Sequence, residues 1–317
     1  MMRYPYILAV AALASPLAAQ TSGTKTDLSA GIEYKEGEYG TGQRIETISA
    51  PIGLRLSSGQ FQFGATLPYL RIDAPGNVIG GGLLGLPIVV DPTQPATRQR
   101  REGVGDLRLG AAYTVPMSSV GLTFSSEVKL PTASAAKGLG TGEVDYSVGA
   151  ELSKTVGRVT PFLGIGYSLP GDPEGYELRN SLSARAGAIV RMSPQVRGHV
   201  SYGYAQSVSP LVPDEQQIAT GLNASLSPRL SLGVYGSAGL SEGAPDIGAG
   251  RGLVSVRASR FSAPLVSPLS RAGWTDDEEA PPARIVVVVL IALLRSMGCA
   301  SAVGIHPRAG AGAGRPA

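Results

Sequence analysis

The sequence predicts an all-β protein, a transmembrane antiparallel β-barrel of about 12 strands with short periplasmic turns and longer outer loops. Three observations lead to this fold class. Charged residues make up only 16% of the chain, 43 residues are glycine, and the mean hydropathy is +0.10. Apolar and polar residues alternate along most of the chain. The connections between these segments are alternately short and long. A sheet with one lipid-facing side and one water-facing side has these properties.

The N-terminus resembles a secretory signal peptide. Arg3 provides a short positive region, residues 7–13 form an apolar core, and Leu17-Ala18-Ala19 precedes Gln20 as a cleavage site. We therefore expect residues 1–19 to be removed and the mature protein to be exported to the outer membrane. The alternative is a buried N-terminal helix.

The body of the chain, residues 20–261, contains the predicted strands. In one of them Val148 and Leu152 alternate with Ser147 and Glu151, and a period of two places such sets on opposite faces of a strand. Most of the segments are long enough for the ~9–11 residues that cross a bilayer at a tilt, whereas a soluble β-sandwich, the alternative, favours strands of about five or six. The segments are 27–35, 44–56, 61–72, 104–115, 120–131, 142–155, 158–168, 179–192, 195–206, 215–226, 229–240 and 247–258.

The connections form two sets that alternate along the chain. The short ones, expected in the periplasm, are 57–60, 116–119, 156–157, 193–194 and 227–228. The long ones, expected outside, are 36–43, 73–103, 132–141, 169–178, 207–214 and 241–246. Connection 132–141 consists almost entirely of small and polar residues, so we expect it only to turn the chain and meet solvent.

The C-terminal residues 262–317 break the alternating pattern. Their apolar run, residues 285–294, is too short for a helix to span a bilayer. We expect an irregular and disordered tail, and a genuine extension and a shifted reading frame both remain open as its origin. The only cysteine, Cys299, lies in this tail, so the exported body has no disulfide.

Charged and polar side chains with inward parity are the candidate lumen lining. Opposite charges across neighbouring strands stabilise a barrel wall, and a mixed-charge lining sets selectivity; the two roles are compatible. The candidates are Asp106, Arg108, Glu127, Lys129, Glu143, Asp145, Glu151, Arg185, Arg197 and His199.

Arginines also recur near the short turns, at Arg55, Arg158, Arg197 and Arg229. They suggest a basic ring at the periplasmic mouth. The alternative is that they only extend to the membrane interface by snorkelling.

Aromatic residues have the opposite, outward parity and predict a girdle at the bilayer interfaces. They are Tyr34, Phe61, Phe63, Tyr69, Tyr113, Tyr146, Tyr167, Tyr202 and Tyr204.

The longest connection, 73–103, is unusually apolar for an outer loop. It folds into the barrel as a gate, or it forms a hairpin that extends the wall above the membrane; the sequence favours neither. The candidate gating residues are Leu83, Leu84, Leu86, Ile88, Val89 and Val90.

Several motifs resemble a family of Gram-negative outer-membrane proteins named after a MetA pathway of phenol degradation, often labelled transporters. The matching stretches are GVGDLRLGAAY (103–113), VKLPT (128–132) and GLGTGEVDYSVGAELSK (138–154), with looser matches in PFLGIGYSLPGD (161–172) and RLSLGVYGSAGLSEG (229–243). The resemblance covers about residues 100–257. It implies an outer-membrane barrel that passes small molecules, aromatic ones included.

Together these features predict a channel or transporter for passive uptake or efflux of small solutes, including aromatic or apolar ones. One alternative is a closed structural or interaction barrel that acts through its outer loops. Another is a lipid-active enzyme that pairs His199 with a serine, but the body has only this one histidine.

The expected partners are outer-membrane lipid, a small-molecule solute and the barrel-assembly machinery. The body is close to neutral, which gives no reason to expect a nucleic-acid partner. We expect no cofactor and no metal, because no Cys/His or Asp-rich metal spacing occurs.

Overall fold

The computed structural model describes residues 24–80, 88–89, 97–117, 120–173 and 177–257. The predicted signal peptide and tail lie outside these residues. So do Leu83, Leu84, Leu86 and Val90 of the candidate gating loop.

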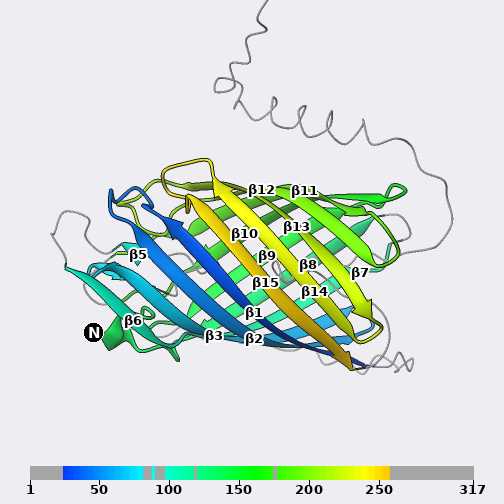
Figure 1. Cartoon of the computed structure of the whole chain (residues 1–317), viewed down its shortest axis with the longest axis horizontal. Coiled ribbons are helices and arrows are strands. Elements are labelled where there is room, and N and C mark those ends of the chain that lie inside the picture. The colour runs from blue at the N-terminus through cyan, green and yellow to red at the C-terminus, as the bar shows by residue number, and fades with distance from the viewer. Residues whose placement is uncertain (1–23, 81–87, 90–96, 118–119, 174–176, 258–317) are drawn as a thin grey trace, which may run out of the picture.

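The chain folds into a closed antiparallel barrel with strongly tilted strands (Figure 1). The strands are β1 (Lys25–Gly37), β2 (Ile45–Ser58), β3 (Phe61–Pro75), β4 (Val78–Ile79), β5 (Ile88–Val89), β6 (Arg98–Val104), β7 (Leu107–Val115), β8 (Gly121–Leu130), β9 (Asp145–Ser153), β10 (Val159–Leu169), β11 (Ser181–Arg191), β12 (Val196–Ala205), β13 (Glu215–Ser227), β14 (Leu230–Gly239) and β15 (Ile247–Arg257). The ring closes because β1 pairs with both β2 and β15. Strands β6 and β7 both pair with β3 and make one interrupted wall strand, so the wall has the predicted 12 strands.

The interruption between β6 and β7 has a local cause. Pro68 of β3 has no amide hydrogen, so it cannot donate to the neighbouring strand. Its carbonyl still accepts a hydrogen bond, from the amide of Gly105 at 2.8 Å. A β-carbon at Gly105 would lie 2.9 Å from side-chain atoms of Pro68 and Leu70, so a larger residue there would push these side chains away. This interruption is a β-bulge, and it turns the side chain of Asp106 into the barrel, where it is almost fully buried.

The two faces of the wall differ in the way that the alternation predicts. Ile52, Val148 and Ile165 are 67%, 55% and 59% exposed although they are large and apolar. Most of the predicted girdle residues are exposed on the same outer surface, and the ring of Phe61 contacts those of Phe63 and Tyr113. An apolar outer surface this extensive requires lipid around it.

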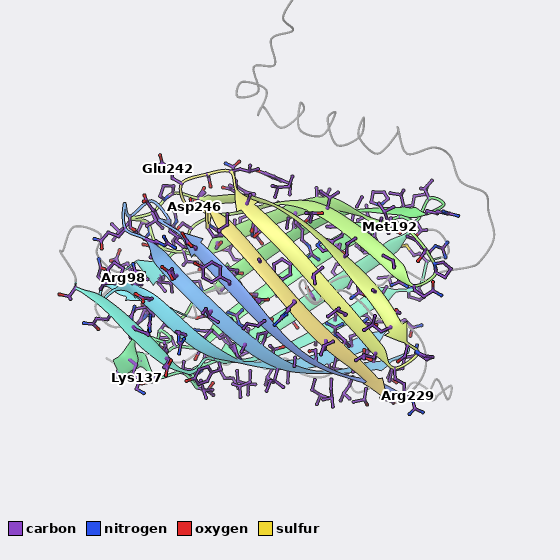
Figure 2. The ribbon with its side chains drawn as sticks, viewed as in Figure 1. Arg98, Lys137, Met192, Arg229, Glu242 and Asp246 are labelled. Carbon is purple, nitrogen blue, oxygen red and sulfur yellow. The ribbon has the colours of Figure 1, made fainter. Side chains whose placement is uncertain are left out.

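The two ends of the barrel carry different connections. Met192 and Arg229 mark the end with the short turns, and Arg98, Lys137, Glu242 and Asp246 mark the end with the long loops (Figure 2). The longest predicted connection is shorter than expected, because β3 continues to Pro75 and β6 begins at Arg98. No helix in the part of the chain that the structure describes is long and apolar enough to cross a membrane.

Candidate functional site: the barrel lumen

The lumen contains a cavity of about 550 Å³. It extends from Arg55 and Gln62, close to the short turns, to Leu70 and Gly80, beneath the outer loops. Hydroxyl side chains line much of it: Thr47, Ser49, Thr66, Ser125, Ser147, Ser168, Ser183, Ser201 and Ser237. Such a surface suits water and small polar solutes.

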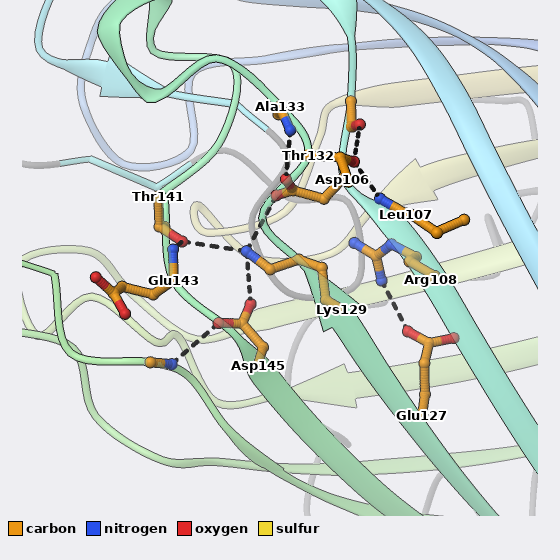
Figure 3. Close-up of polar contacts among 12 residues, drawn as sticks. Asp106, Leu107, Arg108, Glu127, Lys129, Thr132, Ala133, Thr141, Glu143 and Asp145 are labelled. Carbon is orange, nitrogen blue, oxygen red and sulfur yellow. Dashed lines mark hydrogen bonds and ion pairs between the residues drawn. The ribbon is translucent and has the colours of Figure 1, made fainter. Parts of the chain in front are cut away.

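Lys129 is the centre of a buried ionic cluster near the outer end of the lumen (Figure 3). Its ammonium nitrogen lies 3.1 Å from Oδ2 of Asp106, 3.0 Å from Oδ2 of Asp145 and 3.1 Å from the hydroxyl of Thr141. The ammonium group donates a hydrogen bond to Thr141 and forms ion pairs with both carboxylates, while Oδ2 of Asp106 accepts no hydrogen bond from the described residues. We name Asp106, Lys129 and Asp145 the lysine triad.

The lysine triad also holds two outer loops. The other carboxylate oxygen of Asp106 accepts the amide of Ala133 at 2.9 Å, and that of Asp145 accepts the amide of Gly171 at 3.0 Å. Each carboxylate thus joins the lysine to the backbone of a different loop. The triad therefore fixes the loops after β8 and β10 to the barrel wall.

Two further ion pairs lie deeper in the lumen. Arg108 contacts Glu127 at 3.0 Å. Arg185 of β11 reaches Glu151 of β9 across the intervening strand, and it passes Gly164, where a β-carbon would lie 3.2 Å from the arginine side chain. Opposite charges on different strands thus face one another on the inner side of the wall, as the alternation of residues suggested.

Most of the predicted lumen residues come together in this way. Asp106, Arg108, Glu127, Lys129, Asp145 and Arg185 line the cavity. Glu151 is buried against Arg185, and Arg197 and His199 have inward register on β12. Glu143 differs: β9 begins only at Asp145, and Glu143 lies in the loop before it, outside the cavity lining. Its strand assignment was wrong because the alternation continues past the point where pairing stops.

His199 lines a separate cavity of about 20 Å³ with Glu33 and Tyr235. A space of this size holds about one water molecule. Its Nε2 atom is buried and has no hydrogen-bond partner among the described residues.

One serine occurs in a G-x-S-x-G sequence, at residues 239–243, but it does not fit a nucleophile. Ser241 follows the end of β14, where it donates to the carbonyl of Asp214 and accepts the amide of Gln216, each at 2.8 Å. It therefore serves to hold the strand end. A nucleophilic serine in this motif would stand on a strand-to-helix turn.

The outer end of the lumen contains an apolar core, which we name the mouth cluster. Its members are buried and come from strands and loops far apart in the sequence: Tyr39, Ile45, Leu70, Ile72, Ala74, Val78, Ala133 and Leu139. Val212 packs against it from the loop after β12. Ile45 and Ile72 have no exposed surface at all, so water does not reach this part of the mouth.

The described part of the predicted gating loop contributes to this cluster. Val78 belongs to it, and the amide of Gly80 donates to the carbonyl of Gly138 at 2.9 Å. Strand β4 pairs with β5, and Ile88 is buried. The ends of the connection extend the wall as β3 and β6, and Val78 and Gly80 contact the mouth. Most of the candidate gating residues lie outside the described residues, so the choice between a gate and a hairpin stays a prediction.

Sequence reasoning missed the loop between β8 and β9, which packs into the mouth. Leu139 is only 1% exposed, and Gly138 and Gly140 approach Arg101 and Asp106 too closely for a β-carbon. The expectation that this loop only turns the chain was wrong. The available signal was Leu139 itself, a single large apolar residue in a stretch of small polar ones.

The mouth cluster contains one phenol, that of Tyr39. Burial raises the pKa of Tyr39, and the nearby carboxylates of Glu215 and Asp246 raise it further. The residue also has a positive φ of 49°, an uncommon conformation outside glycine. Among the described residues, no three His, Cys, Asp or Glu side chains are grouped to hold a metal ion.

The closed ring, the lipid-facing outer surface and the polar lumen define an outer-membrane β-barrel. Residues 23–258 match the family described as "Putative MetA-pathway of phenol degradation", and the chain belongs to this family. The resemblance found in the motifs is thereby confirmed, and it extends to the N-terminal strands.

Several solved barrels are distantly similar. The NanC porin is 8% identical with a TM-score of 0.47, over 73% of this chain and 100% of that one. The KdgM porin is 8% identical with a TM-score of 0.46, over 72% and 98%. The toluene transporter TodX of Pseudomonas putida is 13% identical with a TM-score of 0.35, over 74% and 88%. A search of curated proteins gave no match.

Proposed function

We propose that the protein is a passive channel for small solutes in the outer membrane, and that the mouth cluster is its gate. The observation that carries this proposal is the combination of a polar lumen cavity with an apolar seal at its outer end. Open and closed transmembrane barrels both have polar interiors, so the cavity of about 550 Å³, and not the hydroxyl groups alone, favours a channel. Solutes cross when the outer loops move and the mouth cluster separates.

The proposal includes export and assembly. The N-terminal sequence resembles a cleaved signal peptide, which supports export, and we expect a lipid-facing barrel of this type to use the assembly machinery for insertion. The surrounding partner is outer-membrane lipid. The solute class inferred from the family name, aromatic molecules, fits the apolar mouth better than the hydroxyl-rich cavity.

Single-channel recording in planar bilayers tests the gate. Leu139→Ser places a hydroxyl in the mouth cluster and should increase the open probability or conductance, because the apolar seal weakens. Deletion of residues 80–90 should act in the same direction. The matched control is Leu163→Ser, which changes a lipid-facing residue that is 54% exposed and should leave the current unchanged.

Two results would count against the channel. If the folded Leu139→Ser and deletion variants conduct no better than the wild type, the mouth cluster is not a gate. If no variant conducts at all, the protein is a closed structural or interaction barrel. Lipid hydrolysis that disappears in His199→Ala would instead support the enzyme.

A further inference from the structure

Glu215 is a buried acid at the outer end of the lumen. It is the first residue of β13, and the next residue, Gln216, lies level with the girdle residue Tyr204. Glu215 borders the main cavity but is only 5% exposed, and its Oε1 atom is buried without a hydrogen-bond partner among the described residues. A charged carboxylate is costly to bury unless other groups pair with it.

Three outer loops meet next to Glu215. Pro213, two residues before it, belongs to the loop after β12. Gly40 of the loop after β1 and Gly243 of the loop after β14 both approach Pro213 too closely for a β-carbon. These two loops therefore close on the segment that leads into Glu215, and their separation would admit water to it.

Tyr39 of the mouth cluster is a second buried polar group without a partner. It is 3% exposed, and its hydroxyl has no hydrogen-bond partner among the described residues. The carboxylate of Glu215 acts electrostatically on this hydroxyl, so the two groups are neighbours. The closed mouth thus leaves two buried polar groups unsatisfied, and opening would let water solvate both.

The charged groups around Glu215 do not neutralise it by direct contact. Lys35 of β1 favours the ionised carboxylate from a distance, but the described residues show no ion pair between the two. Asp246, at the end of the loop after β14, has the same sign as Glu215 (Figure 2), and Asp214 forms its own ion pair with an arginine. Burial without a contacting cation favours the neutral carboxylic acid, so the closed mouth favours protonated Glu215.

We infer that Glu215 makes the mouth pH-sensitive, so that acid keeps the channel closed and alkaline medium opens it. This inference rests on the proposed channel function and adds its regulation. In the closed mouth the side chain carries a proton. When this proton is lost to water, the negative charge that remains is better hydrated with the loops apart. One proton is exchanged, so the ratio of open to closed channels changes by at most about tenfold per pH unit.

Single-channel recording in planar bilayers between about pH 5 and about pH 9 tests the inference. This range extends from near the pKa of an exposed glutamate to that of the most deeply buried ones. The open probability of the wild type should rise with pH, whereas Glu215→Gln, which stays neutral, should keep the low value throughout. The matched control Glu242→Gln removes an exposed carboxylate from the loop after β14 and should retain the pH dependence of the wild type.

Tyr39→Phe provides a second test that involves no charge. The change removes the unpartnered hydroxyl and keeps the ring, so it should stabilise the closed mouth. We expect a lower open probability at every pH, with the rise toward alkaline pH preserved. An unchanged or higher open probability would contradict the burial argument.

The outcomes separate this inference from the channel function. If the wild type is closed at every pH, the same proteins are compared in the Leu139→Ser background; no current in either background refutes the channel itself. Current whose open probability is constant or falls as the pH rises refutes only the pH-sensitive mouth. Equal pH dependence in Glu215→Gln and the wild type also refutes it, because another group would then be responsible.

Discussion

Replacing Lys129 by methionine should be among the most destabilising single changes in the barrel. The side chain is 2% exposed, and the side chains of Asp106 and Asp145 are 2% and 4% exposed. Methionine removes the ammonium group that contacts both carboxylates and leaves two buried negative charges close together. Breaking a buried ion pair by removing one partner costs about 3–5 kcal/mol. We expect a loss in this range or above it, because two carboxylates lose their partner.

Two variants act as controls for this loss. Arg108→Met breaks the ion pair with Glu127, whose side chains are 20% and 29% exposed, and it should cost about 1 kcal/mol or less. Asp106→Asn/Lys129→Met/Asp145→Asn removes every charge of the lysine triad and should recover much of the stability lost in Lys129→Met.

The free energy of unfolding can be measured by urea titration of the refolded barrel in lipid vesicles. A Lys129→Met variant within about 1 kcal/mol of the wild type would refute the reasoning, because the triad would then behave like an exposed pair. Failure of the triple variant to regain stability would also contradict it, since the loss would then come from packing and not from unpaired charge.

The remaining predictions concern the wall. Val148→Arg places a charge on the lipid-facing side and should cost about 2–4 kcal/mol in the same titration, whereas Ser147→Arg, which faces the lumen, should cost much less; equal costs would contradict the assignment of faces. Gly164→Val should push the side chain of Arg185 away from Glu151, because a β-carbon there meets the arginine at 3.2 Å. We expect altered single-channel conductance with an intact barrel, and unchanged conductance would mean that this pair does not shape the pathway.

Much of the barrel wall could be predicted because the face on which a strand residue lies depends on the local sequence. A period of two assigns each residue of β9 to a face without reference to any other strand, and pairing between neighbours then brings Lys129 beside Asp145. The same rule failed at Glu143, where the alternation continues but the strand does not.

The mouth cluster could not be predicted in this way. It joins Tyr39 to Leu139 and Val78, residues from three different outer loops, and loops follow no period that would relate them. Only the closed ring brings these loops to one end. The apolar character of Leu139 was visible in the sequence, but its partners were not.

The central claim is that the lumen is closed from outside by the mouth cluster and opens when this cluster is weakened. The most direct measurement is the labelling rate of a cysteine at Ser125, which faces the cavity, by a membrane-impermeant thiol reagent added outside intact cells. The natural Cys299 is replaced by serine in all samples. We predict slow labelling of Ser125→Cys alone and fast labelling when it is combined with Leu139→Ser. Equal rates in the two proteins would contradict the account.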